Sequence, residues 1–139
     1  MRTLLDANAL IAVILDEPAM TPVLALLREG NAAMTAANVV EVYDVSSRRE
    51  GLPVDRVAAV VEPLFAGVIE QVVVDPAMSR RAAEIRGEHY HRAKQALSLA
   101  DVILLAAAAP ADRVATSDSA VLAVAAELGI ETIELPPSG

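Results

Sequence analysis

Several acidic residues lie where short apolar runs end, and some have no polar neighbours. Asp6 interrupts the run LLDANALIAVIL, and Asp101 interrupts SLADVILLAAA. A carboxylate in such surroundings loses hydration and needs a hydrogen bond, a cation or a proton to offset that loss. Three further acids lie in comparable places: Glu41 in NVVEVYD, Asp75 after a β-branched run and Asp118 after VATS. If several of these carboxylates meet, a divalent cation would offset their mutual repulsion.

The types of side chain available favour a hard cation. Carboxylates and water suit Mg²⁺ or Mn²⁺, whereas zinc prefers Cys and His. The chain has no Cys and only two His, in the segment EHYH. His89 and His91 are two residues apart, so on a helix they point to different sides, and we do not expect them to form a metal site.

The same acids also fit helix caps, an alternative that stays open at this stage. A carboxylate at an N-cap stabilises a helix by about 1 kcal/mol, and in a capping box it returns a hydrogen bond to the cap residue. Two pairs fit a capping box, Asn38 with Glu41 and Ser98 with Asp101. Three further acids fit a simple N-cap: Asp6, Asp75 and Asp118. Capping alone does not explain the apolar flanks of Asp6 and Asp101.

Short β-type runs alternate with helical ones along the chain. Strands are expected at residues 2–5, 32–35, 68–74, 113–116 and 131–135. Helices are expected at 7–15, from Thr21 as cap to Gly30, and at 38–49, 54–67, 78–89, 99–109 and 119–128. This order predicts an α/β fold, a three-layer α/β/α sandwich with a parallel sheet.

A parallel sheet binds ligands at the carboxyl ends of its strands. The acids that follow strands, and those in the first turns of the next helices, are therefore the candidates. Asp112 precedes its strand, so it belongs to the opposite edge.

Composition fits one domain over residues 1–139 with an aliphatic core, since 55% of residues are hydrophobic and 2% aromatic. The net charge of −8 argues against a broad basic surface for nucleic acid. A local basic patch remains possible from Arg48, Arg49, Arg80, Arg81, Arg86, Arg92 and Lys94, although solvated helix faces explain most of them. No apolar run approaches the roughly 18 residues of a membrane span, and we expect a cytoplasmic protein without disulfides.

Four segments together, LLDANALIAVIL, NVVEVYD, SLADVILLAAA and VATSDSAVLAVA, resemble the PIN-domain nucleases, and most of all the short VapC-type toxins of bacterial toxin–antitoxin pairs. The resemblance covers nearly the whole chain. It implies a roughly five-stranded sheet in the order 3-2-1-4-5 and a Mg²⁺-dependent endoribonuclease, with Mn²⁺ as a substitute. It also implies that the third strand is at the edge, which leaves Asp75 as a cap only.

The resemblance assigns roles to individual residues. Asn8 and Thr116 match positions that support the first Asp and its surroundings. The catalytic and metal-binding acids would be Asp6, Glu41, Asp101 and Asp118.

One position departs from the family pattern. Many relatives carry a further Asp where this chain has Ala120, so the number of metal ions stays open. Asp44, one turn after Glu41, is a possible substitute.

The reaction implied is hydrolysis of an RNA phosphodiester by water activated at a metal, leaving a 5′-phosphate and a 3′-hydroxyl. A structured RNA such as tRNA or rRNA is the expected substrate, because specific recognition targets unpaired loops. The expected partners are an antitoxin protein, whose Arg would enter the acidic site, and a second copy of the chain; no membrane is expected. Apolar segments 23–27 and 39–43 are either binding grooves or buried core.

Two alternatives remain at this stage. A degenerate relative would bind RNA or protein without cutting it. A haloacid-dehalogenase-like or receiver domain would transfer phosphoryl groups, but it needs a Lys near a late strand, and the only Lys is Lys94.

Overall fold

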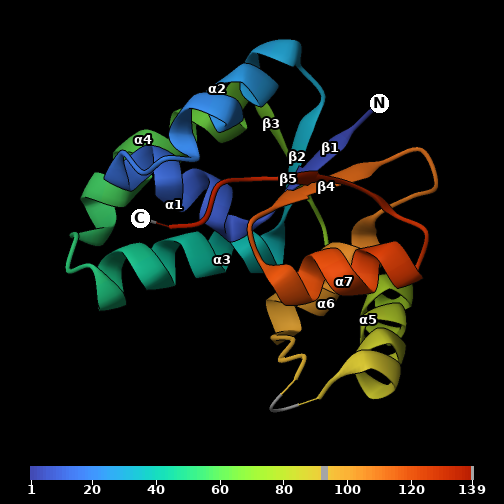
Figure 1. The fold of residues 1–139 in the computed structure, drawn as a ribbon. Coiled ribbons are helices and arrows are strands. Elements are labelled where there is room, and N and C mark those ends of the chain that lie inside the picture. Colours follow the sequence, from blue (N-terminus) through green and yellow to red (C-terminus); the bar gives the residue numbers. More distant parts are fainter. Residues whose placement is uncertain (92–93, 139) are drawn as a thin grey trace.

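Five short parallel strands form the middle of the molecule (Figure 1). The computed structural model, which describes residues 1–91 and 94–138, places them in the order β3-β2-β1-β4-β5. The strands are β1 (Thr3–Leu5), β2 (Ala32–Thr35), β3 (Ile69–Val72), β4 (Arg113–Thr116) and β5 (Glu131–Glu134). The predicted parallel sheet and its strand order are confirmed.

Helices cover both faces of the sheet (Figure 1). One face carries α1 (Ala7–Leu15), α2 (Met20–Glu29), α3 (Ala36–Asp44) with its π-helical continuation η1 (Val45–Arg49), and α4 (Val54–Gly67). The other face carries α5 (Pro76–His89), α6 (Leu99–Ala107) and α7 (Ser119–Glu127). The three layers match the predicted sandwich.

The central strands supply both hydrophobic cores. Leu4 and Ala33 pack with α5, α6 and α7, whereas Leu5 and Met34 pack against α1 and its neighbours. Successive side chains of a strand point to opposite faces. A strand that is buried on both faces therefore has no polar alternation, which explains the unbroken apolar run before Asp6.

Some predicted boundaries were wrong. Strand β3 is shorter than residues 68–74, and helix 99–109 ends at Ala107. Thr21 does not cap α2, which begins at Met20 after Ala19. The helix predicted at 38–49 is two elements, α3 and the wider turns of η1.

The start of α3 corrects one of the two predicted capping boxes. The cap is Thr35, whose Oγ1 accepts the Asn38 N–H at 3.2 Å and donates to Asn38 Oδ1 at 2.6 Å. Because α3 begins at Ala36, Glu41 lies in its second turn, beyond the positions that a cap uses. The capping box of Asn38 with Glu41 is therefore wrong, and Glu41 needs another explanation.

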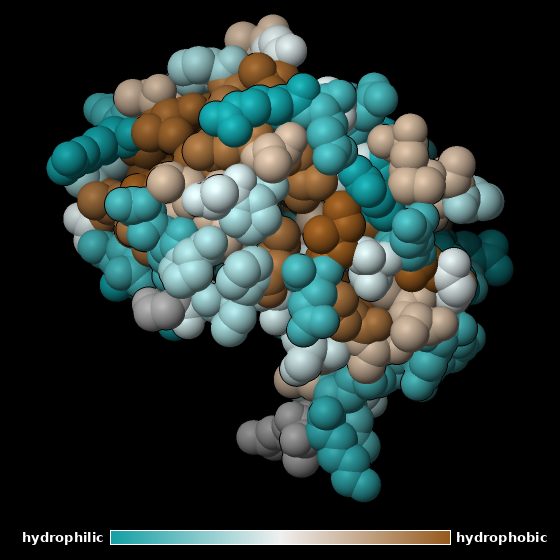
Figure 2. Space-filling view, turned by 45° about the horizontal axis from the view of Figure 1, so that its top comes forward, coloured by the Kyte–Doolittle hydropathy of each residue, from teal (hydrophilic) through white to brown (hydrophobic). Residues whose placement is uncertain are grey.

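No single helix in residues 1–91 and 94–138 is long and apolar enough to cross a membrane, although α1 and α2, bent by 116° to each other, reach that length and hydropathy together. Figure 2 shows hydrophobic residues mixed with hydrophilic ones on the visible face.

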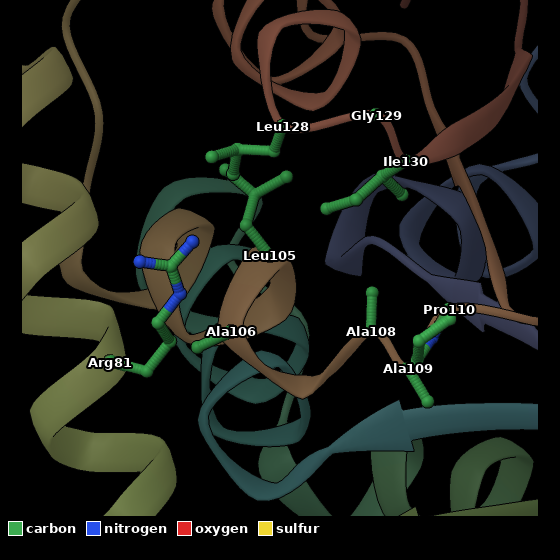
Figure 3. Close-up of a pocket in the computed structure, with 9 residues that line it drawn as sticks. All are labelled: Arg81, Leu105, Ala106, Ala108, Ala109, Pro110, Leu128, Gly129 and Ile130. Carbon is green, nitrogen blue, oxygen red and sulfur yellow. The ribbon is translucent and has the colours of Figure 1, made fainter.

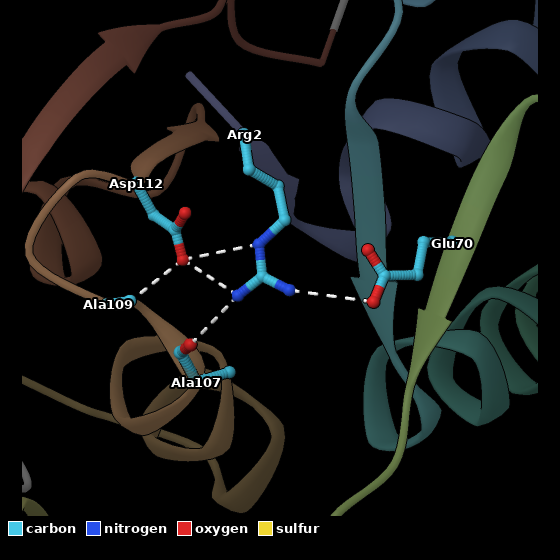
Figure 4. A network of polar contacts seen from close by, with 5 residues as sticks. All are labelled: Arg2, Glu70, Ala107, Ala109 and Asp112. Atoms are coloured by element: carbon cyan, nitrogen blue, oxygen red, sulfur yellow. Dashed lines mark hydrogen bonds and ion pairs between the residues drawn. The ribbon is translucent and has the colours of Figure 1, made fainter.

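The amino edge of the sheet is held by a polar network around Arg2 (Figure 4). The Arg2 guanidinium donates to Asp112 Oδ2 at 2.7 Å and lies 3.7 Å from Glu70. The Ala109 N–H donates to the same Asp112 oxygen at 2.9 Å. Although burial opposes it, these hydrogen bonds lower the pKa of Asp112 below its usual value. Asp112 thus has a structural role at this edge, as its position before β4 predicted.

We expect Arg2→Met to lower the free energy of unfolding by about 1–3 kcal/mol, because it leaves the buried Asp112 carboxylate without its charged partner. Chemical denaturation at pH 7 measures the loss. The matched control is Arg48→Met, which breaks the exposed Arg48–Asp44 pair and should leave stability nearly unchanged, because solvent screens such pairs. Equal losses in the two variants would contradict this role for Arg2.

Candidate active site

The carboxyl ends of β1 and β4 lie side by side at the centre of the sheet. From β1 the chain passes toward β2, and from β4 toward β5, so this is the switch point of the topology. Asp6 continues the pairing of these strands, since its N–H donates to Ala115 O at 3.0 Å. Helices α3 and α6 pack against each other, which brings Glu41 and Asp101 to the same edge.

An open cavity of about 380 Å³ at this edge gathers the predicted site residues. Its lining includes all four acids of the predicted set and the supporting residue Asn8. The remaining wall comes from α5 and from the segment before α6. The full lining is Asp6, Asn8, Glu41, Arg86, Tyr90, Ala96, Leu97, Ser98, Asp101 and Asp118.

Asp6 is at the N-cap position of α1, yet its side chain makes no capping hydrogen bond. Only 2% of Asp6 is exposed, and its Oδ2 accepts the hydroxyl of Thr116 at 2.6 Å. The same Thr116 oxygen accepts the Asp118 N–H at 3.0 Å. Thr116 therefore links the acids that follow β1 and β4, and the cap explanation fails for Asp6.

Asp101 and Asp118 are true caps. Asp101 forms the predicted capping box, in which its Oδ2 accepts the Ser98 N–H at 2.9 Å. Asp118 Oδ1 accepts N–H groups from Ala120 at 2.8 Å and Val121 at 3.2 Å. Each carboxylate uses one oxygen for capping, and its other oxygen receives no hydrogen bond from residues 1–91 or 94–138. Capping and lining the cavity are thus compatible roles.

Glu41 caps no helix and forms no ion pair with residues 1–91 or 94–138. Its Oε2 is buried without a hydrogen-bond partner in the part of the chain that the structure describes. Burial, reinforced by the carboxylates of Asp6, Asp101 and Asp118, raises the pKa of Glu41 to about 7. Burying a polar atom without a partner is costly, so this oxygen is suited to an external ligand.

Two further acids of the cavity, Asp6 and Asp101, also have raised pKa values. Burial raises the pKa of Asp6 to about 6, with smaller contributions from Asp101 and Asp118, while the Thr116 hydrogen bond acts in the opposite direction. Burial and the Asp118 carboxylate raise the pKa of Asp101, against the hydrogen bonds from Ser98. A cavity that disfavours its own negative charge is suited to a cation or a shared proton.

The donors fit a hard divalent cation. They are carboxylate oxygens, of which Glu41 Oε2 has no partner, and these suit Mg²⁺ or Mn²⁺. Within residues 1–91 and 94–138, however, no three His, Asp or Glu side chains group closely enough to surround one ion. Three of the acids are instead held by their separate hydrogen bonds to Thr116, Ser98 and the first turn of α7.

Other residues considered in the sequence lie elsewhere. Asp75 is an exposed cap whose Oδ1 accepts the Met78 N–H at 2.8 Å, as predicted. Asp44 forms a two-point pair with Arg48 and does not line the cavity. His89, the last residue of α5, lies 2.8 Å from Glu127, and His91 lies beyond the end of the helix.

The family of this chain is decided by comparison with models of known families. The model of the PIN domain matches residues 3–134. The chain belongs to the PIN domain family. PIN domains are typically nucleases and generally use a divalent metal. Membership removes the haloacid-dehalogenase-like and receiver-domain alternatives.

Solved structures show the same fold for this PIN domain. A chain of FitAB bound to an IR36 DNA fragment is 22% identical with a TM-score of 0.61, over 95% of this chain and 94% of that one. A chain of FitAcB from Neisseria gonorrhoeae is 22% identical with a TM-score of 0.60, over 95% and 96%. No curated protein sequence matches this PIN domain significantly.

A second cavity of about 270 Å³ lies at the opposite, amino edge of the sheet (Figure 3). It is bordered by the loops that lead into β4 and β5, including Pro110 and Gly129. Arg81 is its only charged lining residue, and no carboxylate lines it. This cavity therefore lacks the carboxylates that line the cavity at the carboxyl edge.

Two residues of the acidic cavity were missed from the sequence. The sequence places Arg86 only in a general basic patch and assigns no role to Tyr90, between the two histidines of EHYH. Both are on the last turn of α5 or just after it, and both line the cavity. Their spacing of four residues on a helix, shortly before the Ser98–Asp101 box, was the available signal.

Proposed function

We propose that this PIN domain is an endoribonuclease that depends on Mg²⁺ or Mn²⁺, and that it is the toxin of a toxin–antitoxin pair acting on a structured RNA such as tRNA or rRNA. One observation carries the proposal. Carboxylates from four separate elements line one open cavity at the switch point of the sheet, and the most buried of them, Asp6, makes no capping bond. A purely structural role does not account for that arrangement.

Each acid of the cavity, and Thr116 beside it, would have a defined role. Asp6, Glu41, Asp101 and Asp118 would hold the cation, and Thr116 would keep Asp6 in place. When bound, the cation supplies positive charge opposite the phosphate and lowers the pKa of a water. Hydrolysis of the phosphodiester would add water to phosphorus and break the bond to the 3′-oxygen, which would leave a 3′-hydroxyl and a 5′-phosphate. Glu41, whose Oε2 is buried without a hydrogen-bond partner in the described part of the chain, would become ionised when the cation binds.

The direct test is incubation of total RNA with purified protein in Mg²⁺, Mn²⁺ or EDTA. Discrete fragments that appear only with a cation would support the proposal. Absence of cleavage in both cations would defeat it and would favour a PIN domain that binds RNA or protein without cutting.

Thr116 offers a finer test of the site. We expect Thr116→Val to reduce cleavage about 10- to 100-fold, because groups that orient a metal ligand typically have effects of this size. Thr116→Ser keeps the hydroxyl that donates to Asp6 and should retain most of the activity. Initial rates at saturating Mg²⁺, with circular dichroism to verify folding, provide the comparison. Equal activity of the Val and Ser variants would remove Thr116 from the site.

The partners proposed are an antitoxin and a second copy of the chain. The segment 23–27 is mainly core, because Val23 and Leu26 are buried. Segment 39–43 is divided, since Val42 is buried but Val40 is 67% exposed. Val54 and Val60 on α4 are also exposed. Size-exclusion chromatography, alone and after co-expression with the product of the neighbouring reading frame, tests both partners; a monomer with no companion would refute them.

A further inference from the structure

Arg86 and Tyr90 form a fixed pair on the wall of the acidic cavity. The Arg86 guanidinium lies 4.5 Å from the centre of the Tyr90 ring, a cation–π distance. Arg86 Nε donates to the carbonyl of the buried Leu97 at 3.1 Å, which anchors the side chain. The pair is therefore held in place before any ligand arrives.

The same two residues also line a neighbouring hollow. This hollow, of about 320 Å³, is completed by Ala83, Gly87 and Leu99. Gly87 has open space where a side chain would be, and Leu99 is 65% exposed. Arg86 and Tyr90 thus stand between an acidic cavity and an open apolar surface.

The exposure of Tyr90 is unusual for this chain. Only three aromatic residues occur in the sequence. Tyr43 and Phe65 pack against the core, whereas Tyr90 is 42% exposed. A flat aromatic ring beside an open apolar hollow is suited to stacking with a planar ligand.

The charge of Arg86 is also not neutralised by a nearby carboxylate. Arg48 pairs with Asp44, and Arg80 and Arg81 pair with Glu84. Within residues 1–91 and 94–138, no carboxylate lies within 4.0 Å of Arg86. The chain has a net charge of −8, which repels a phosphate group. The positive charge of Arg86 at the rim of the cavity would offset this repulsion when a phosphate approaches.

We propose that Arg86 and Tyr90 bind one unpaired nucleotide of RNA beside the acidic cavity, with its base stacked on Tyr90 and its phosphate against Arg86. The nucleotide must be unpaired, because bases within a duplex do not expose their faces to a side chain. The choice of RNA as ligand rests on the proposed nuclease function. Stacking on one ring is sequence-tolerant, so the pair positions RNA and leaves base selection to other contacts.

Binding can be measured apart from cleavage. The parent protein for these measurements carries Asp6→Asn, so that it does not cleave the RNA. The probes are single-stranded RNAs of about ten nucleotides, a length within common site sizes. Each probe carries the fluorescent base 2-aminopurine at a different position. Stacking on the ring quenches the fluorescence of this base. We expect quenching at one position, and about 5- to 100-fold weaker binding with loss of that quenching in Tyr90→Leu. Tyr90→Phe should retain both.

The contribution of the Arg86 charge is measured separately, from the salt dependence of RNA binding. Arg86→Gln should weaken binding and lower the slope of log affinity against log salt by about one. Arg80→Gln, on the exposed side of the same helix, is the matched control and should leave the slope unchanged. Thermal unfolding of each variant verifies that it is folded.

The outcomes separate this proposal from the nuclease proposal. If the parent binds RNA but Tyr90→Leu binds and quenches equally well, the nucleotide site is wrong even if the wild type cuts RNA. If quenching depends on Tyr90 but the wild type never cleaves RNA, the nucleotide site stands and the nuclease proposal fails. Equal binding of a fully paired duplex would also overturn the site, as would Tyr90-dependent binding of the antitoxin with no binding of RNA.

Discussion

Asp6→Asn is expected to reduce RNA cleavage by at least about 100-fold while the protein stays folded. Residues that merely orient a metal ligand have effects of about 10- to 100-fold, so loss of a direct ligand should exceed them. Asn has the shape of Asp, and its Oδ1 can still accept the hydroxyl of Thr116. Initial rates of cleavage in Mg²⁺ measure the effect, with circular dichroism to show that the fold is kept.

The matched control is the same substitution at an acid outside the cavity. Asp75 is an exposed N-cap, and Asn is an equally good cap residue, so Asp75→Asn should leave both activity and stability nearly unchanged. Asp6, in contrast, makes no capping bond that Asn would have to replace. Equal activity in Asp6→Asn and Asp75→Asn would remove Asp6 from the catalytic machinery.

The metal-free protein is expected to unfold at a higher temperature at pH 5 than at pH 8. Asp6 and Glu41 have folded-state pKa values of about 6 and about 7, above the values of about 4 in unfolded chains. The folded state therefore binds more protons than the unfolded state between pH 4 and pH 7, and stability falls as the pH rises through this range. Between pH 5 and pH 8, Asp6 alone contributes roughly 1–1.5 kcal/mol, because about one unit of its pKa shift falls in this range, and this corresponds to a shift on the order of 3–5 °C.

Two controls identify the source of this pH dependence. Asp6→Asn removes one titrating group and should reduce the difference between pH 5 and pH 8. Mg²⁺ in place of EDTA should stabilise the protein mainly at pH 8, where the carboxylates are ionised and can bind it. Asp112 acts in the opposite direction, but its lowered pKa confines that effect to pH below about 4. A melting temperature that is higher at pH 8 than at pH 5 in EDTA would contradict the burial of unpaired carboxylates.

Most of the fold could be predicted because its sequence signals are local. Helix α1 and strands β2 and β4 have the predicted bounds, since residues that favour turns or caps flank each of them. Boundaries failed where two signals competed. Asn38 is a good cap residue, but Thr35 is nearer the end of β2 and takes that role, with Asn38 bonded to it.

The cavity was predictable once the resemblance to PIN-domain nucleases supplied the strand order, whereas the details of its walls were not. Acids that follow adjacent parallel strands must meet at one edge of the sheet, so strand order alone places Asp6 and Asp118 together. The role of Thr116 as a bridge between them depends on side-chain orientation, and only the resemblance suggested it. Arg86 and Tyr90 reach the site through the packing of α5 on α6, a contact that no local pattern specifies.

The chemistry of the RNA ends tests the central claim most directly. RNA should be cut by wild-type protein in Mg²⁺, and by Asp6→Asn protein purified in the same way, and the termini of the fragments then determined. We predict 5′-phosphate and 3′-hydroxyl ends that require both Asp6 and the cation, because water attacks phosphorus and the 3′-oxygen leaves. Fragments with 5′-hydroxyl and 2′,3′-cyclic phosphate ends, or fragments that form equally in EDTA, would contradict a metal-dependent nuclease at this site.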